Sequence, residues 1–124
     1  MRSIYPEVFE AWIGGYLGPS YHLLLSDAGI TYKVYEYAYE LHSTEVIVPS
    51  STAWSRFFST LDQVEVWSWQ KVYKAEASCD PTTWYLSIAI NGRKQVCRGI
   101  NMFAPGFVEY LRSVRGLLDG RPFA

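Results

Sequence analysis

Apolar and polar residues alternate with a period of two through several segments of the chain, a pattern typical of β-strands with one buried face. Residues 21–25 and 30–39 are two such runs, and the tripeptide Asp27-Ala28-Gly29 lies between them. A turn acid followed by glycine predicts that the two runs form a hairpin. Residues 44–48 are a third run, and it stops at Pro49, which cannot donate a hydrogen bond to a strand ladder.

The second half of the chain repeats this pattern. Residues 84–90 alternate strictly, and Asn91-Gly92 follows them before a return strand over residues 93–100. Asn-Gly predicts a two-residue hairpin because both residues tolerate the positive φ of a type I′ turn. Residues 64–73 also have β character, with bulky side chains on both faces, which predicts a strand that is central or near a rim. Residues 4–15 are expected to form a short strand or docking segment.

Two segments change to the helical period. After the candidate N-caps Ser50, Ser51 and Thr52, one apolar stripe is formed by Trp54, Phe57, Phe58 and Leu61. A final helix is predicted after Pro105-Gly106, and its stripe consists of Phe107, Tyr110, Leu111, Val114, Leu117 and Leu118. Gly120 is expected to end that helix, with Pro122 beyond it.

Strands joined by hairpins, with two separated helices, predict an α+β fold in one domain covering residues 1–124. The economical arrangement is a twisted, mainly antiparallel sheet with both helices packed on one face. The other face of the sheet is then open, and the sequence predicts that it is rich in aromatic side chains.

Composition narrows the class of protein. Hydrophobic residues make up 49% of the 124 and charged residues 19%, so a packed core is expected. A net charge of -1 argues against binding to duplex nucleic acid, which normally requires a basic face. The N-terminal residues lack the apolar run of a signal peptide, and no run approaches the roughly 20 residues that cross a bilayer. Two cysteines are too few for a disulfide framework, so we expect a cytoplasmic protein without membrane association.

The most informative candidate site is a tyrosine stripe on the predicted strand 30–39. Ile30, Tyr32 and Val34 should face the core, and the opposite side should carry Lys33, Tyr35, Tyr37 and Tyr39, with Tyr85 beside them. Tyrosine is enriched at interfaces because it offers a large contact area at small entropic cost. The alternative is that cross-strand aromatic pairs simply cover a solvent-facing sheet, and the sequence leaves both interpretations open.

A second aromatic group could line a cleft, and it consists of Trp67, Trp69, Tyr73 and Trp84. We favour the other interpretation, in which these residues anchor the sheet against the helices. Asp80 and Asn101 could converge as polar groups at one end of the sheet. Asx residues more often close turns and loops, so a structural role is favoured for both.

Reactive and metal-binding constellations are poorly supported. His22, His42, Cys79 and Cys97 are scattered along the chain and do not form the close ligand pairs of a structural zinc site, so no metal or cofactor is expected. Cys97 is expected to be a core residue and Cys79 to lie near a loop. A hydrolase that uses Asp80 or Asp62 with His22 or His42 is a third hypothesis, less favoured than a binding module or a homodimer.

The order and spacing of several motifs resemble a group of small, mainly bacterial proteins. The similarity runs over residues 14–118, and the motifs are Gly14-Gly15 with Gly18-Pro19 and Tyr21, Trp67-x-Trp69 with Tyr73, Asp80 with Trp84-x-Leu86-x-Ile88, and Gly99-x-Asn101 with Pro105. Two positions depart from the group's pattern, since Pro81 replaces a glycine and Ala104 is an extra residue before Pro105. The resemblance implies an architecture and no activity.

The preferred hypothesis is therefore a small non-enzymatic binding module whose aromatic sheet face contacts a protein partner. A homodimer that buries the same face is the alternative. A single-stranded nucleic-acid binder is conceivable from the aromatic residues, but the sequence shows no basic groove.

Overall fold

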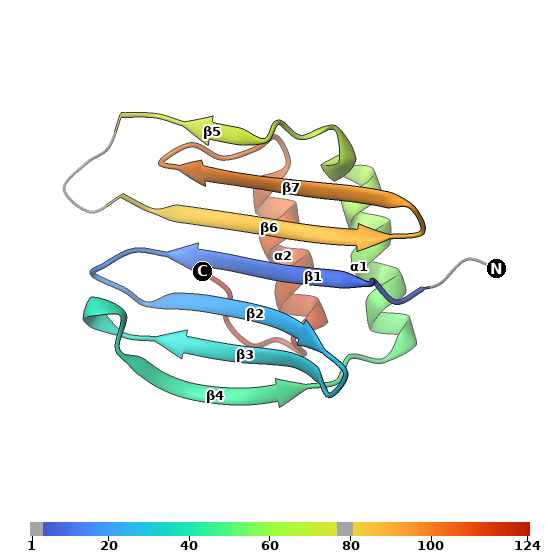
Figure 1. Cartoon of the computed structure of the whole chain (residues 1–124), viewed down its shortest axis with the longest axis horizontal. Coiled ribbons are helices and arrows are strands. Elements are labelled where there is room, and N and C mark those ends of the chain that lie inside the picture. The colour runs from blue at the N-terminus through green and yellow to red at the C-terminus, as the bar shows by residue number, and fades with distance from the viewer. Residues whose placement is uncertain (1–3, 77–80) are drawn as a thin grey trace.

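In the computed structural model, which describes residues 4–76 and 81–124, seven strands form one twisted sheet (Figure 1). Their order across the sheet is β4-β3-β2-β1-β6-β7-β5, and every neighbouring pair is antiparallel except β5 with β7. The strands are β1 (Val8–Gly14), β2 (Ser20–Ser26), β3 (Gly29–Tyr35), β4 (Leu41–Ile47), β5 (Val72–Lys74), β6 (Thr83–Ile90) and β7 (Arg93–Ile100).

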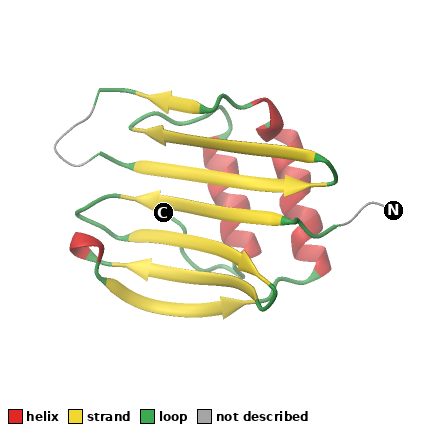
Figure 2. Ribbon diagram, in the orientation of Figure 1, coloured by secondary structure: helices red, strands yellow, loops and turns green. Residues whose placement is uncertain are grey.

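Two helices, α1 (Ser51–Gln63) and α2 (Phe107–Leu117), lie together behind the sheet in this view (Figure 2). The core fills the space between the two layers. The ring of Phe9 on β1 packs edge-on against Trp54 of α1 at 5.8 Å, and Trp84 on β6 packs against Phe107 of α2 at 4.8 Å. The predicted α+β fold, with both helices on one face, is confirmed, and no helix or strand of the described residues covers the opposite face. We call this the outer face.

Local signals in the sequence account for most element ends. The side-chain oxygen of Ser50 accepts a hydrogen bond from the amide of Ala53 at 3.1 Å, so Ser50 is the N-cap of α1. Asn91 and Gly92 have φ of 52° and 80°, as a type I′ turn requires. The segment 4–15, expected to be a short strand or docking segment, contains β1, which pairs on both sides and is the central strand of the sheet.

The predicted strand over residues 64–73 is wrong. Glu65 takes a left-handed conformation after α1, residues Val66–Ser68 form a short 3-10 helix, and only the three-residue edge strand β5 remains. The cause is distant in sequence. The buried amide of Gln95 on β7 donates hydrogen bonds of 2.9 Å to the carbonyls of Val66 and Trp69, which holds this segment as a turn.

The predicted strand over residues 30–39 is too long. β3 ends at Tyr35, and Tyr37–Tyr39 form a 3-10 turn that connects it to β4. The amide of Glu36 donates to the carbonyl of Glu40 at 2.7 Å, which closes the turn. The three tyrosines therefore do not share one strand face.

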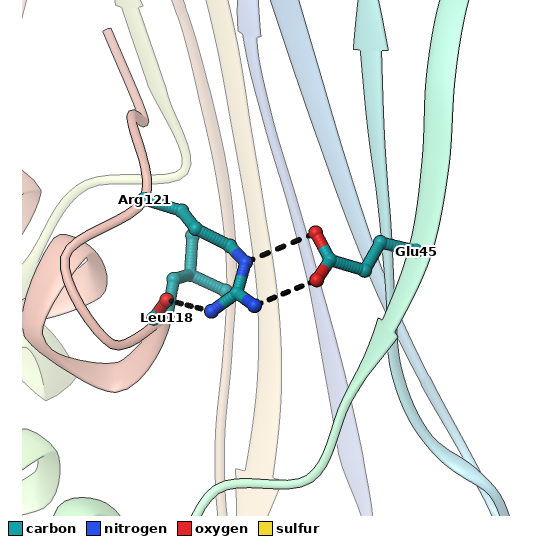
Figure 3. Close-up of polar contacts among 3 residues, drawn as sticks. All are labelled: Glu45, Leu118 and Arg121. Atoms are coloured by element: carbon teal, nitrogen blue, oxygen red, sulfur yellow. Dashed lines mark hydrogen bonds and ion pairs between the residues drawn. The ribbon is translucent and has the colours of Figure 1, made fainter.

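The C-terminal segment crosses to the far edge of the sheet. Arg121 makes a two-pronged ion pair with Glu45 of β4, with nitrogen–oxygen distances of 3.0 and 2.6 Å, and also donates to the carbonyl of Leu118 (Figure 3). The hydroxyl of Tyr32 donates to the carbonyl of Pro122 at 2.6 Å. These contacts hold β4 and its neighbour β3 against the segment that follows α2.

Candidate functional site

One continuous row of side chains crosses the outer face. Strand register places Lys33 opposite His22, His22 opposite Trp12, Trp12 opposite Tyr85, and Tyr85 opposite Arg98. Each of these residues alternates with a neighbour that is buried beneath the sheet, so their side chains are on the face that the helices leave uncovered. At about 4.8 Å per strand, the row spans about 19 Å from Lys33 to Arg98.

Five aromatic residues gather at one end of this face. We call them the aromatic cluster, and they are Trp12, Tyr16, Tyr35, Tyr37 and Tyr39. The indole of Trp12 lies at the base, with ring-centroid distances of 5.8 Å to Tyr35 and 6.1 Å to Tyr39. Tyr16 packs edge-on against Tyr37 at 5.2 Å and against Tyr39 at 5.8 Å. The cluster joins the loop between β1 and β2 to the turn between β3 and β4.

The exposed part of the aromatic cluster is held by an unusual backbone. Ala38 and Tyr39 both have positive φ, of 59° and 58°. Two consecutive non-glycine residues in the left-handed region of φ/ψ space are uncommon, and each such conformation costs of the order of 1–3 kcal/mol of conformational free energy. The amide of Ala38 donates to the carbonyl of Tyr16 at 2.7 Å, which fixes the turn to the neighbouring loop. As a result Tyr37 and Tyr39 remain 59% and 48% exposed, whereas Tyr35 is half-buried.

Polar groups border the aromatic cluster. The imidazole of His22 lies 2.7 Å from the carboxylate of Glu10, and its ring is 6.3 Å from that of Trp12. His42 pairs with Glu36 at 3.0 Å in a much more exposed position. Neither histidine lies within 4.0 Å of Asp62, whose carboxylate instead accepts from Trp67 and Arg93. The hydrolase hypothesis in which Asp62 acts together with His22 or His42 is therefore not supported. The alternative carboxylate, Asp80, lies outside the described residues.

The other end of the outer face is basic. Arg98 and Lys94 on β7 and Lys71 beside β5 line an open hollow together with Tyr85 and Val96. Lys33, by contrast, is half-buried near the aromatic cluster. Of the residues predicted for the binding face, the structure thus brings Tyr35, Tyr37 and Tyr39 together and places Lys33 and Tyr85 along the adjoining row.

The second predicted aromatic group forms core and not a cleft. Trp69, Tyr73 and Trp84 are 6%, 6% and 2% exposed and pack against one another and the aromatic residues of α2. The indole of Trp84 donates to the carbonyl of Met102 at 2.9 Å. Trp67 is half-buried at the edge, where the guanidinium of Arg93 lies 4.4 Å above its ring. The favoured interpretation of these residues as sheet anchors agrees with their positions.

Asn101 has a structural role. Its side-chain oxygen accepts from the amide of Thr82 at 2.9 Å, and its side-chain nitrogen donates to the carbonyl of Glu76 at 3.3 Å. It therefore joins the two chain segments that flank residues 77–80. The proposed convergence with Asp80 falls outside the described residues, as does the expected loop position of Cys79.

Cys97 is a core residue, as predicted. Its side chain is 1% exposed, and desolvation by burial raises the pKa of the thiol to about 12. A thiol with such a pKa is almost entirely protonated at neutral pH and is a poor nucleophile. Within residues 4–76 and 81–124, no group of three or more His, Cys, Asp or Glu side chains is placed to hold a metal ion. In the same part of the chain, neither helix has the length and apolar character needed to cross a bilayer.

Sequence inspection missed two members of the aromatic cluster, Trp12 and Tyr16. The signal for Trp12 was present, because Phe9, Ala11 and Ile13 alternate with it and are buried. Tyr16 had no such signal, since its place in the cluster depends on the distant turn at Ala38.

A scan against protein-family models finds no match to this sequence, and no curated protein matches it. The resemblance to a group of small bacterial proteins therefore stays a prediction.

Proposed function

We propose that this protein is a small non-enzymatic binding module that contacts a protein partner through the aromatic cluster. The observation that carries the proposal is the turn at Ala38 and Tyr39, which presents two tyrosines to solvent. A connection between two antiparallel strands does not require this strained backbone. Strain of this kind clusters at functional sites, where the surrounding structure holds a conformation that the segment would not adopt alone.

The chemistry of the cluster fits protein recognition. Tyr16 and Tyr37 are 49% and 59% exposed and pack against each other, and Leu41, which is 55% exposed, lies opposite Tyr35 on the neighbouring strand. Contiguous exposed apolar groups rimmed by polar ones mark interaction sites, and tyrosine is enriched at such sites. The half-buried Trp12 packs against the exposed Tyr39, and this contact limits the motion of the Tyr39 ring, which reduces the entropy lost on binding. A cytoplasmic location is part of this proposal.

The test is affinity capture with three forms of the chain. We expect a partner to be retained by the native protein and lost by the double variant Tyr37→Ser/Tyr39→Ser. The matched control is Val108→Ser, which removes a 61% exposed apolar side chain from α2 on the opposite side of the sheet. Tyr35 is left intact because it is more buried than Tyr37 and Tyr39 and packs against Trp12, so its removal would affect stability as well as binding. Capture of the same partner by the double variant would refute the proposal.

A symmetric homodimer is the second candidate. It is favoured by the edge strand β4, which lies beside the aromatic cluster and has six of its seven residues exposed. An exposed edge can pair with the same strand of a second copy. Sedimentation equilibrium decides between the two, because a mass of one chain at high protein concentration excludes the homodimer.

A further inference from the structure

Charge is distributed unevenly over the outer face. Lys71, Lys74, Lys94 and Arg98 are exposed on or beside β5 and β7, and we call these four the basic half. Among the described residues, no carboxylate lies within 4.0 Å of any of the four, whereas Arg93 and Arg121 on the helix side are both paired with acids. The chain as a whole has a net charge of -1, so the basic half is a local concentration of cations on a slightly acidic protein.

Apolar groups lie among these cations. Val72 and Val96 are 47% and 39% exposed, and with Tyr85 they line the same hollow as Lys94 and Arg98. A surface of this kind offers a contact area with complementary charges around it, the arrangement by which interfaces steer and align a partner. Tyr85 lies between Arg98 and Trp12 in the cross-strand row, so the basic half is continuous with the aromatic cluster.

We infer that the protein partner presents an acidic surface, whose carboxylates contact Lys94 and Arg98 while its apolar groups contact the aromatic cluster. The inference rests on the proposed function, and it adds the chemistry of the partner. Lys94 and Arg98, which pair with no carboxylate among the described residues, gain carboxylate partners in the complex. Rim pairs of this type accelerate association and make binding sensitive to salt.

Single-stranded nucleic acid is the other anion that an aromatic sheet could bind, and the geometry is less suited to it. Base stacking needs open ring faces. The indole of Trp12 is surrounded by His22, Tyr35 and Tyr39, with ring-centroid distances of 5.8–6.3 Å and interplanar angles of 45–55°. The most central aromatic ring of the row is therefore already packed against its own neighbours.

The test uses a displayed library of random-sequence peptides, selected against the full chain. Three variants are compared with the native protein: Lys94→Glu/Arg98→Glu in the basic half, Tyr37→Ser/Tyr39→Ser in the aromatic cluster, and Arg56→Glu/Arg112→Glu as the control. The control has the same change in net charge at two exposed cations of α1 and α2. Oligouridylate is titrated in parallel as a nucleic-acid probe.

We expect the enriched peptides to be acidic and to bind the basic-half variant about tenfold or more weakly, with little change for the control. Their affinity should also fall as salt is added. Enriched peptides that are neutral, or that bind the basic-half variant unchanged, overturn the inference. If those peptides still require Tyr37 and Tyr39, the proposed binding function stands, and only the inference of an acidic partner is overturned. Acidic peptides that require Lys94 and Arg98 but not the tyrosines would instead contradict the aromatic contact surface. The inference is also overturned if the protein binds oligouridylate more tightly than any peptide. It is overturned as well if the native protein enriches no peptides beyond those that the basic-half variant enriches.

Discussion

Replacement of Gln95 by Met should destabilise the protein by about 2–4 kcal/mol, because two buried carbonyls lose the same donor. The side-chain nitrogen of Gln95 donates to the carbonyls of Val66 and Trp69, both at 2.9 Å, and the residue is 8% exposed. The carbonyl of Val66 keeps a second hydrogen bond, from the amide of Trp69 at 3.1 Å. Loss of its bond to Gln95 should therefore cost only about 1 kcal/mol of stability. The carbonyl of Trp69 contributes the rest, about 1–3 kcal/mol for a buried acceptor without its partner. Met has a similar volume, so a cavity adds little.

Urea unfolding followed by tryptophan fluorescence measures this change. The matched control is Lys94→Met, which alters the adjacent residue of β7 on the outer face and should shift the free energy of unfolding by less than about 0.5 kcal/mol. The slope of the free energy against urea should be equal in the two variants, so that the midpoints compare stability directly. A loss below about 0.5 kcal/mol for Gln95→Met would refute the assignment of the turn at Val66–Trp69 to this side chain.

Three further changes test other parts of the structure. Gly99→Ala should lower the free energy of unfolding by about 1–3 kcal/mol in the same assay, because a Cβ there would overlap the indole nitrogen of Trp84; unchanged stability would contradict that packing. Cys97, whose thiol pKa burial raises to about 12, should resist iodoacetamide at neutral pH until the protein is unfolded, as peptide mass spectrometry can show; rapid labelling of the native protein would contradict it. The hydrogen bond from Arg121 lowers the pKa of Glu45, so this pair stabilises the fold above the unfolded pKa of about 4.3 and its contribution is lost as pH falls. Thermal unfolding across that range should show a weaker pH dependence in Arg121→Gln, and identical profiles would exclude the linkage.

Sequence patterns predicted the parts of the fold that short-range chemistry determines. The hairpin at Asn91-Gly92 and the start of α1 at Ser50 depend on residues within a few positions of each other. The strand predicted over residues 64–73 failed for the opposite reason. Its alternation resembles a strand, but Gln95, more than 20 residues away, supplies hydrogen bonds that hold the segment as a turn. A buried side-chain amide has this effect because it satisfies backbone carbonyls, that of Trp69 above all, whose burial without a donor is costly.

In the candidate site, too, features set by neighbouring residues were predictable and those set by distant contacts were not. Strand alternation placed Lys33 and Tyr35 on the outer face, and it could have placed Trp12 there as well. It could not find the aromatic cluster, because the hydrogen bond between Ala38 and Tyr16 joins two loops that no local pattern connects.

The same bond explains why the exposed tyrosines can be separated from the stability of the core. Tyr37 and Tyr39 lie in a turn that backbone hydrogen bonds hold in place, from Ala38 to Tyr16 and from Glu36 to Glu40. These bonds do not involve the rings or hydroxyls of Tyr37 and Tyr39. Tyr37 and Tyr39 are 59% and 48% exposed, so their replacement by serine removes less buried apolar area per residue than the loss of the half-buried Tyr35, which packs against Trp12. A binding surface on an open sheet requires this separation, because residues that hold the two layers together cannot also be free to contact a partner. In this protein the core aromatic residues hold the helices from one side of the sheet, and a separate set of aromatic residues remains available on the other.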